Sequence, residues 1–130
     1  MDDYLRDCFD EHFEQVVLEL PAKVRDLIDE VSVIIDDYPS REMMRRLGLR
    51  CRQSLCGLYT GVPITARSVY DSGQIPAVIH LFREGIISRS YDRTGTLTFE
   101  ELRKQIRLTL LHEFGHHHGL EERELEELGY

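Results

Sequence analysis

The segment from residue 98 to residue 119 constrains the fold more than any other part of this sequence. Thr98, followed three residues later by Glu101, forms a capping box, a pattern typical of a helix N-terminus. Apolar side chains then recur at helical spacing on one face: Leu102, Ile106, Leu110 and Leu111. Gly119 is typical of the left-handed turn that ends a helix. We therefore predict a helix over residues 99–118, about 30 Å long at ~1.5 Å per residue.

Shorter elements are predicted on the N-terminal side of this helix. Apolar residues at helical spacing predict a helix over residues 4–20, and Pro21 fits the first turn of another over residues 22–30. β-Branched residues predict a strand over residues 31–35. A nearly continuous apolar run predicts a second strand over residues 77–82.

The remaining segments are less regular. A short amphipathic helix is predicted over residues 41–47, and an acidic helix over residues 121–128. Residues 49–74 are rich in Gly, Ser and Thr, and they suggest short extended pieces around a turn, at residues 58–59 and 62–64.

These elements indicate the fold class. Two strands flanked by helices indicate an α+β fold, with a small sheet packed on the long helix, rather than a βαβ array. A chain of 130 residues is expected to form one compact domain over residues 1–130, with a core that needs no disulfides. The odd number of cysteines favours free thiols in a reducing compartment; they are Cys8, Cys51 and Cys56.

Charge and hydropathy exclude several classes of partner. The formal net charge is −8, whereas proteins that bind nucleic acid normally carry a basic patch. The basic cluster in residues 41–52 is interrupted by apolar residues and resembles the solvated side of a short helix. The acidic N-terminus does not resemble a secretory signal, and no apolar run approaches the ~20 residues of a membrane span. We expect a cytoplasmic protein without nucleic-acid or membrane partners.

The long predicted helix carries the motif H-E-x-x-H, formed by His112, Glu113 and His116. Residues four apart share one face of a helix, so both imidazoles are placed to bind one tetrahedral Zn²⁺ ion. Glu113 lies one step around the helix and is suited to act as a general base rather than as a ligand. The motif therefore predicts one zinc ion per chain and a hydrolytic reaction.

A hydrolytic zinc site uses a third protein ligand and keeps one position open. Gly119 can turn the chain, and a residue ten positions after His112 can then return to the ion; that residue is Glu122. Glu121 is the rival ligand. His117 and His118 point away from His116 on a helix, and we expect them to be surface or packing residues.

The sequence resembles the bacterial minimal zincins, a family of short zincin-like metallopeptidase domains. The resemblance rests on five stretches of sequence: residues 20–21, 31–35, 58–68, 75–82 and 111–130. It implies a compact zincin-like fold, a zinc ion and peptidase activity on peptides or unfolded protein. It also implies His112 and His116 as ligands and Glu113 as the catalytic base.

The sequence departs from this family at one ligand position. The family usually has Asp at the position of the third ligand, whereas this chain has Glu122, which is one methylene longer. The methionine turn of larger metzincins is also absent, because Met43 and Met44 lie upstream of the motif.

The sequence also contains candidates for substrate binding and for oxyanion stabilisation. Zincins bind substrate as an added strand along a sheet edge, and the resemblance suggests residues 77–82 as that edge. The alternative is a buried core strand in which His80 is a packed histidine. Four side chains are candidate donors to a transition-state oxyanion: Tyr59, Arg67, Tyr70 and Tyr91.

The sequence agrees with three functions to different degrees. A zinc metallopeptidase agrees best with the motif, because Glu113 has no use in a purely structural site. A non-catalytic metal-binding or interaction module is the main alternative, although structural zinc sites usually have four protein ligands and more cysteines. A metal-dependent ribonuclease uses a similar ligand spacing, but the acidic net charge argues against it.

Overall fold

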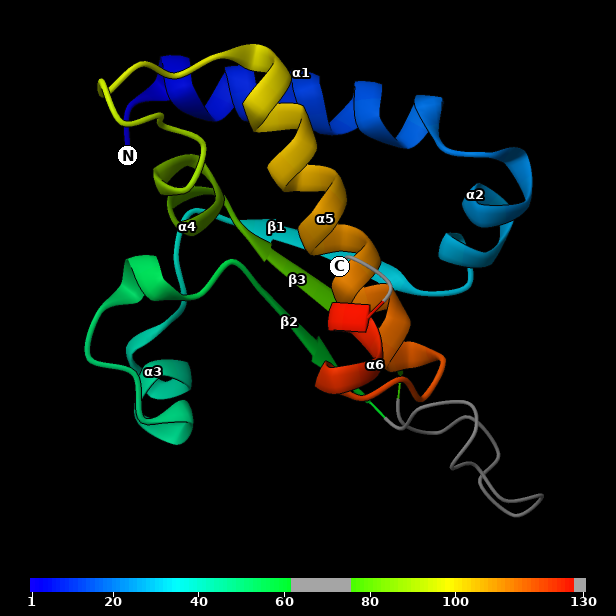
Figure 1. The fold of residues 1–130 in the computed structure, drawn as a ribbon. Coiled ribbons are helices and arrows are strands. Elements are labelled where there is room, and N and C mark those ends of the chain that lie inside the picture. Colours follow the sequence, from blue (N-terminus) through cyan, green and yellow to red (C-terminus); the bar gives the residue numbers. More distant parts are fainter. Residues whose placement is uncertain (62–75, 128–130) are drawn as a thin grey trace, which may run out of the picture.

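A computed structural model describes residues 1–61 and 76–127 of the chain (Figure 1). Its helices and strands follow one another in the order α1 (Asp3–Glu19), α2 (Ala22–Ile28), β1 (Ser32–Asp36), α3 (Arg41–Leu47), a 3-10 turn η1 (Arg52–Ser54), β2 (Gly57–Thr60), β3 (Val78–Phe82), α4 (Arg83–Ser88), α5 (Phe99–His117) and α6 (Glu122–Glu127). The predicted α+β class is confirmed.

The strands form one mixed sheet in the order β1-β3-β2. β3 pairs in parallel with β1, so that Ile34 lies opposite His80, and antiparallel with β2, so that Leu58 lies opposite the same histidine. β3 is therefore the central strand and β2 is an edge strand among the described residues. The prediction that residues 77–82 form the substrate-binding edge is wrong, and the alternative of a core strand is right.

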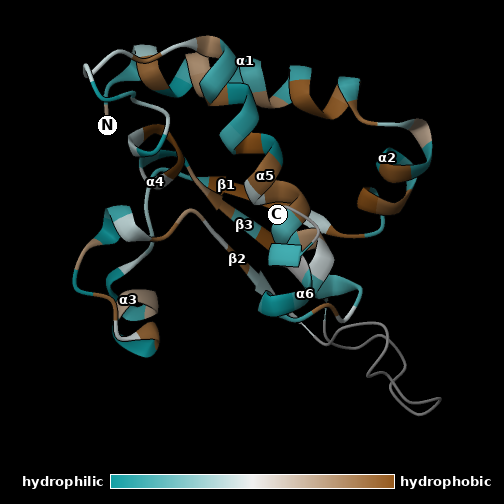
Figure 2. Cartoon of the chain, viewed as in Figure 1, coloured by the Kyte–Doolittle hydropathy of each residue, from teal (hydrophilic) through white to brown (hydrophobic). Residues whose placement is uncertain are grey.

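The hydrophobic core lies between the sheet and the helices α1, α4 and α5. Figure 2 shows the apolar sides of these elements turned toward one another, while α6 is hydrophilic. Side chains four apart on α5 supply the centre of this core; they are Leu102, Ile106, Leu110 and Phe114. Ile79 and Leu81 alternate along β3 and reach the same core from the sheet.

Most predicted elements lie within two residues of their observed bounds. The predicted helix 41–47 has the bounds of α3, and Gly48 ends it with a left-handed φ of 66°. The predicted helix 99–118 ends one residue earlier, at His117, and its N-cap Thr98 accepts a hydrogen bond from Glu101 N–H as the capping box requires. The predicted piece at residues 62–64 lies outside the described residues. All three cysteines are free thiols.

Helix α4 was not predicted. It follows β3 without a loop, because β3 ends at Phe82 and α4 begins at Arg83. Gly85, in the middle of this short helix, is a weak helix former and obscures the pattern. The structure shows why glycine lies there: a Cβ at this position would be 2.2 Å from the carbonyl oxygen of Leu55. The chain that leads into β2 therefore rests directly on α4.

Ion pairs join the start of α4 to α1 and to the end of β1. Arg83 donates hydrogen bonds to Asp10 of α1, and to Asp37, which follows β1. Arg6 of α1 also donates two hydrogen bonds to Asp37. The hydrogen bond from Arg6 lowers the pKa of Asp37, although burial acts in the opposite direction. This cluster fixes the end of the sheet relative to α1 and α4.

Replacement of Gly85 by alanine tests the contact between α4 and the chain before β2. In an open helix this change stabilises by about 1 kcal/mol, but here the new Cβ would overlap backbone atoms of Leu55. We predict that Gly85→Ala lowers the free energy of unfolding in urea by about 2–3 kcal/mol.

Gly48→Ala is the control for this prediction. A Cβ at Gly48 meets nothing within 4 Å, so only the positive φ opposes it, and a loss of about 1 kcal/mol is expected. A Gly85→Ala variant as stable as the parent would contradict the contact.

Candidate metal centre

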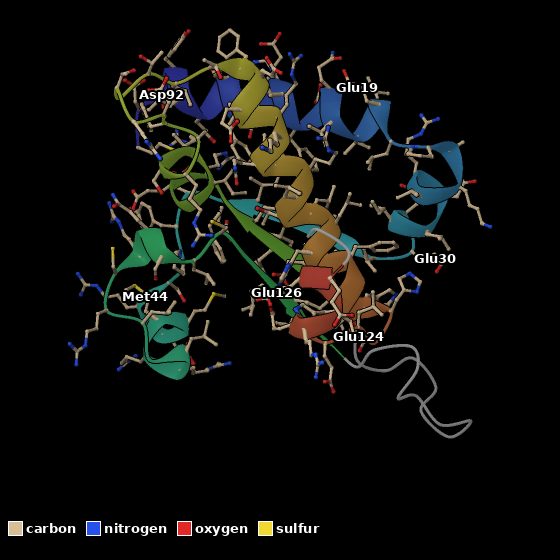
Figure 3. The ribbon with its side chains drawn as sticks, viewed as in Figure 1. Glu19, Glu30, Met44, Asp92, Glu124 and Glu126 are labelled. Carbon is tan, nitrogen blue, oxygen red and sulfur yellow. The ribbon has the colours of Figure 1, made fainter. Side chains whose placement is uncertain are left out.

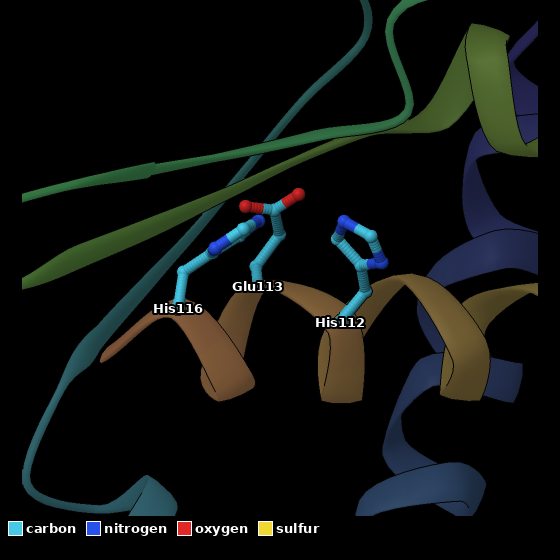
Figure 4. A group of neighbouring side chains, drawn as sticks. All are labelled: His112, Glu113 and His116. Carbon is cyan, nitrogen blue, oxygen red and sulfur yellow. The ribbon is translucent and has the colours of Figure 1, made fainter. Parts of the chain in front are cut away.

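The last two turns of α5 bring together the three side chains of the H-E-x-x-H motif. His112, Glu113 and His116 project from one side of the helix toward the sheet (Figure 4). One potential ligand atom from each residue lies within 4.8 Å of the others. The two imidazoles are partly exposed, whereas Glu113 is buried. This group can hold a metal ion.

The turn after α5 brings Glu122 to the same place. Gly119 has a left-handed φ of 80°, its N–H donates to His116 O, and the next N–H, of Leu120, donates to Gly115 O. These two bonds form a Schellman motif, which reverses the chain at the helix end. α6 then begins at Glu122, whose Oε1 lies 3.0 Å from Nε2 of His112 and 2.8 Å from Nε2 of His116.

The donor atoms fit zinc. Zinc bonds of about 2.0–2.1 Å in a tetrahedral arrangement place neighbouring ligand atoms roughly 3.3 Å apart. The distances from Glu122 Oε1 to the two imidazole nitrogens are a few tenths of an ångström shorter than that. Two imidazole nitrogens and one carboxylate oxygen are also donors that zinc commonly takes. The ligand roles of His112, His116 and Glu122 remain predictions.

A backbone contact orients one of the two imidazoles. Nδ1 of His116 lies 2.9 Å from the carbonyl oxygen of Leu120. A carbonyl only accepts hydrogen bonds, so Nδ1 carries the proton of the neutral ring and Nε2 keeps its lone pair. The lone pair therefore points to the side where Glu122 lies. Contacts of this kind hold metal-binding histidines in place in many proteins.

Glu113 lies in a different environment from Glu122. Burial raises the pKa of Glu113, while the charges of His112 and His116 act in the opposite direction. The backbone N–H of Tyr59 on β2 donates a hydrogen bond to the Glu113 carboxylate and also favours its charged form. A carboxylate with a raised pKa is a stronger base, so this environment suits proton transfer.

Burial raises the pKa of Glu122 as well, but the protonated forms of His112 and His116, which donate to this carboxylate, outweigh that effect and lower the pKa overall. Glu122 is also the more exposed of the two carboxylates. The surroundings of Glu122 therefore favour its charged form beside the imidazoles.

Glycine at position 57 allows β2 to approach the site closely. A Cβ there would lie 2.8 Å from Cγ2 of Thr109 and 3.1 Å from Cγ of Glu113. A second contact joins the same elements, because the Tyr59 hydroxyl and Nδ1 of His117 are hydrogen-bonded at 2.9 Å. β2 is therefore held against α5 on both sides of Glu113.

The remaining histidines near the motif, the rival ligand Glu121 and His80 have partners other than the imidazoles of His112 and His116. His117 is buried against Tyr59, and His118 packs against Phe114, as expected for packing residues. Among the described residues, no hydrogen bond joins the Glu121 carboxylate to either imidazole; its N–H donates to Glu124. His80 stacks on Phe82, as a packed histidine does.

Of the four candidate oxyanion donors, one lies far from the site, one lines it, and two lie outside the described residues. Tyr91 pairs with Leu97, just before α5 begins at Phe99. This end of α5 lies about 20 Å from His112 along the helix axis, at ~1.5 Å per residue. Figure 3 shows the neighbouring Asp92 at that distant end, far from Glu124 and Glu126 of α6. Tyr59 lines the site, but its hydroxyl is bonded to His117. Arg67 and Tyr70 lie outside the described residues.

Two grooves meet at Glu113 and Gly57. The larger one, of about 620 Å³, we call the His116 groove, and it is lined by Gly57, Leu58, Tyr59, Gly61, Glu113, His116, Gly119, Leu120, Glu121 and Glu122. The smaller one, of about 360 Å³, we call the His112 groove, and it is lined by Ser54, Cys56, Gly57, Arg89, Gln105, Leu108, Thr109, His112 and Glu113. The two grooves share Gly57 and Glu113, so they adjoin at the start of β2, and we call the pair of grooves the cleft.

Two features that support the motif from outside α5 were not predicted from the sequence: Gly57 and the backbone N–H of Tyr59, both on β2. Arg89, which directly follows α4 and lines the His112 groove, was not predicted either. Gly57 lies in a segment without periodicity, and nothing local distinguishes it from a loop glycine. Arg89 could have been found only if α4 had been predicted.

Comparison with known proteins agrees with this geometry. The sequence model of a family described as zincin-like metallopeptidase matches residues 28–130, which include every strand and the complete site. A search of curated proteins finds no match. No helix among residues 1–61 and 76–127 is long and apolar enough to cross a membrane. Since the family model covers most of the sequence, the chain belongs to the zincin-like metallopeptidase family.

Proposed function

We propose that this chain is a zinc-dependent peptidase that holds one zinc ion through His112, His116 and Glu122. The observation that carries the proposal is the convergence of one oxygen of Glu122 on Nε2 of both histidines. Glu113 lies beside this group, buried and hydrogen-bonded to the backbone of β2. A structural site has no need of such a carboxylate, whereas a hydrolytic site does.

Each residue has a defined part in the proposed reaction. Bound zinc supplies a Lewis acid that polarises a carbonyl group and makes water more acidic. The Glu113 carboxylate takes a proton from the attacking water and passes it to the leaving amine. The raised pKa of Glu113 favours the first of these transfers. The N–H of Tyr59 keeps the carboxylate directed into the cleft.

The His116 groove, which β2 lines, suits an extended peptide. β2 has one partner strand, β3, among the described residues, so its other edge can pair with the backbone of a substrate. We propose peptides or unfolded protein as substrates, since a folded protein does not present a free strand to such an edge. The free thiols suit a reducing compartment, and we propose that the protein acts in the cytoplasm.

The first prediction concerns zinc binding. The parent is expected to hold one zinc ion per chain. His112→Ala and His116→Ala should each weaken zinc affinity more than about 100-fold, because a lost ligand costs more than a lost supporting contact. Elemental analysis after dialysis against a weak chelator measures this. His118→Gln, a change at a packing histidine, is the control and should keep its zinc. Full zinc retention in both alanine variants would contradict the site.

The second prediction separates catalysis from binding. Glu113→Gln should keep zinc and fold, but it should lower the rate of peptide hydrolysis by about 10²–10⁴-fold, because the amide cannot accept the proton. Rates on a fluorogenic peptide library, with and without chelator, measure this, and Glu124→Gln on exposed α6 is the control. Unchanged cleavage by Glu113→Gln would show that the base is another residue. Loss of its zinc would instead make Glu113 a ligand.

The third prediction concerns the third ligand. Glu122→Ala should weaken zinc binding by more than about 100-fold, while Glu121→Ala should bind zinc like the parent. Glu122→Asp should keep activity, because the family usually has the shorter carboxylate there. Competition for zinc with a coloured chelator ranks the three variants. The reverse order, with Glu121→Ala losing zinc and Glu122→Ala keeping it, would show that the turn at Gly119 presents the other carboxylate.

A further inference from the structure

The two grooves that meet at Glu113 differ in charge. The His116 groove is lined by the carboxylates of Glu113, Glu121 and Glu122. Among the residues that the structure describes, the His112 groove is lined by one carboxylate, that of Glu113, and by one arginine, Arg89. A substrate along the cleft therefore meets acidic groups in one half and an arginine in the other.

The guanidinium of Arg89 is anchored but not neutralised. Arg89 caps the C-terminus of α4, and its Nη2 donates a hydrogen bond to the carbonyl oxygen of Ser54 at 3.2 Å. Among residues 1–61 and 76–127, Arg89 forms no ion pair, whereas its neighbours Arg52 and Arg83 are each bonded to carboxylates. An arginine has five N–H donors, so several remain for a ligand.

Cys56 lies close enough to both Arg89 and Glu113 for each charge to act on its thiol. Burial raises the pKa of the Cys56 thiol; in addition, the charge of Arg89 lowers it and the charge of Glu113 raises it. The thiol therefore lies within electrostatic reach of both groups. All three residues line the His112 groove.

The direction of β2 determines which end of a peptide reaches Arg89. β2 runs from Gly57, which lines both grooves, to Thr60 and then Gly61, which lines the His116 groove alone. Antiparallel pairs are more common and slightly more stable than parallel pairs. A peptide antiparallel to β2 runs from the His116 groove to the His112 groove. The part that follows the scissile bond then lies beside Arg89.

We propose that Arg89 binds a carboxylate of the substrate on the C-terminal side of the scissile bond. This inference rests on the proposed peptidase function. Planar guanidinium groups bind carboxylates through paired hydrogen bonds, so an arginine is well suited to this role. The carboxylate is the side chain of an acidic residue or the C-terminus of a short peptide, and both present the same chemistry to Arg89.

Three peptides that share one cleavable sequence test the proposal. The first has Glu after the scissile bond and an amidated C-terminus, the second has Gln there and a free C-terminus close to the bond, and the third has Gln and an amide. We expect kcat/KM to be about tenfold higher for at least one of the first two than for the third, mainly through KM. The peptide that gains identifies the source of the carboxylate.

Variants of Arg89 connect this preference to the groove. Arg89→Gln should abolish the preference for a carboxylate, but it should leave kcat for the third peptide, which has Gln and an amide, within about twofold of the unmodified protein. Arg89→Lys should retain part of the preference, because lysine keeps the positive charge without the paired donors. Arg93→Gln, an exposed arginine in the loop before α5, is the matched control and should keep the preference. A parent that shows no preference, or an Arg89→Gln variant that keeps it, would overturn the proposal.

A binding measurement separates this inference from the proposed function. Acetyl-Glu-amide, acetyl-Gln with a free carboxylate and acetyl-Gln-amide are titrated into the zinc-loaded protein, and the NMR shift of the Arg89 Nε–H signal is followed. Movement of the Arg89 signal with a carboxylate probe but not with the amide, while the Nε–H signal of exposed Arg93 stays in place, supports the inference even if no peptide is cleaved. A lack of cleavage would by itself contradict the proposed peptidase function. Cleavage without carboxylate-dependent binding would overturn the inference alone. The absence of both would overturn both.

Discussion

The close packing of α5 against β2 is the contact on which the site depends. Gly57 lets the strand approach the helix beside Glu113, and the Tyr59 N–H donates to that carboxylate. The hydrogen bond between Tyr59 and His117 fixes the strand one turn further along α5. Because the apolar side of α5 is fully buried in the core, the helix serves as the rigid base for this contact. The motif is thus held by the centre of the fold rather than by a loop.

The two carboxylates of the site illustrate how environment separates chemical roles. Glu113 is buried and is held by backbone from β2, whereas Glu122 lies beyond the helix end and touches both imidazoles. The backbone of the Schellman turn does more than end α5, because the same turn supplies the Leu120 carbonyl that orients His116. A single glycine, Gly119, thereby links helix termination to the geometry of the candidate metal centre.

Local patterns predicted the parts of this protein whose geometry is local. The capping box, the four-residue spacing of the core side chains and Gly119 together predicted α5, the motif on it and the return of the chain at residue 122. They could not predict α4, because Gly85 is present for its contact with Leu55 rather than for helix formation. Nor could they place residues 77–82 inside the sheet, because the order of strands depends on pairing with β2, which has little periodicity. Arg89 was missed for the same reason as α4.

The most direct test of this account is an anomalous difference map, measured at the zinc absorption edge, from crystals of the zinc-loaded protein. The account predicts one peak per chain, bonded to Nε2 of His112, Nε2 of His116 and a carboxylate oxygen of Glu122 at about 2.0–2.1 Å. Glu113 should lie outside the bonding distance. A peak elsewhere in the molecule, or a peak bonded to Glu121 or Glu113 in place of Glu122, would contradict it.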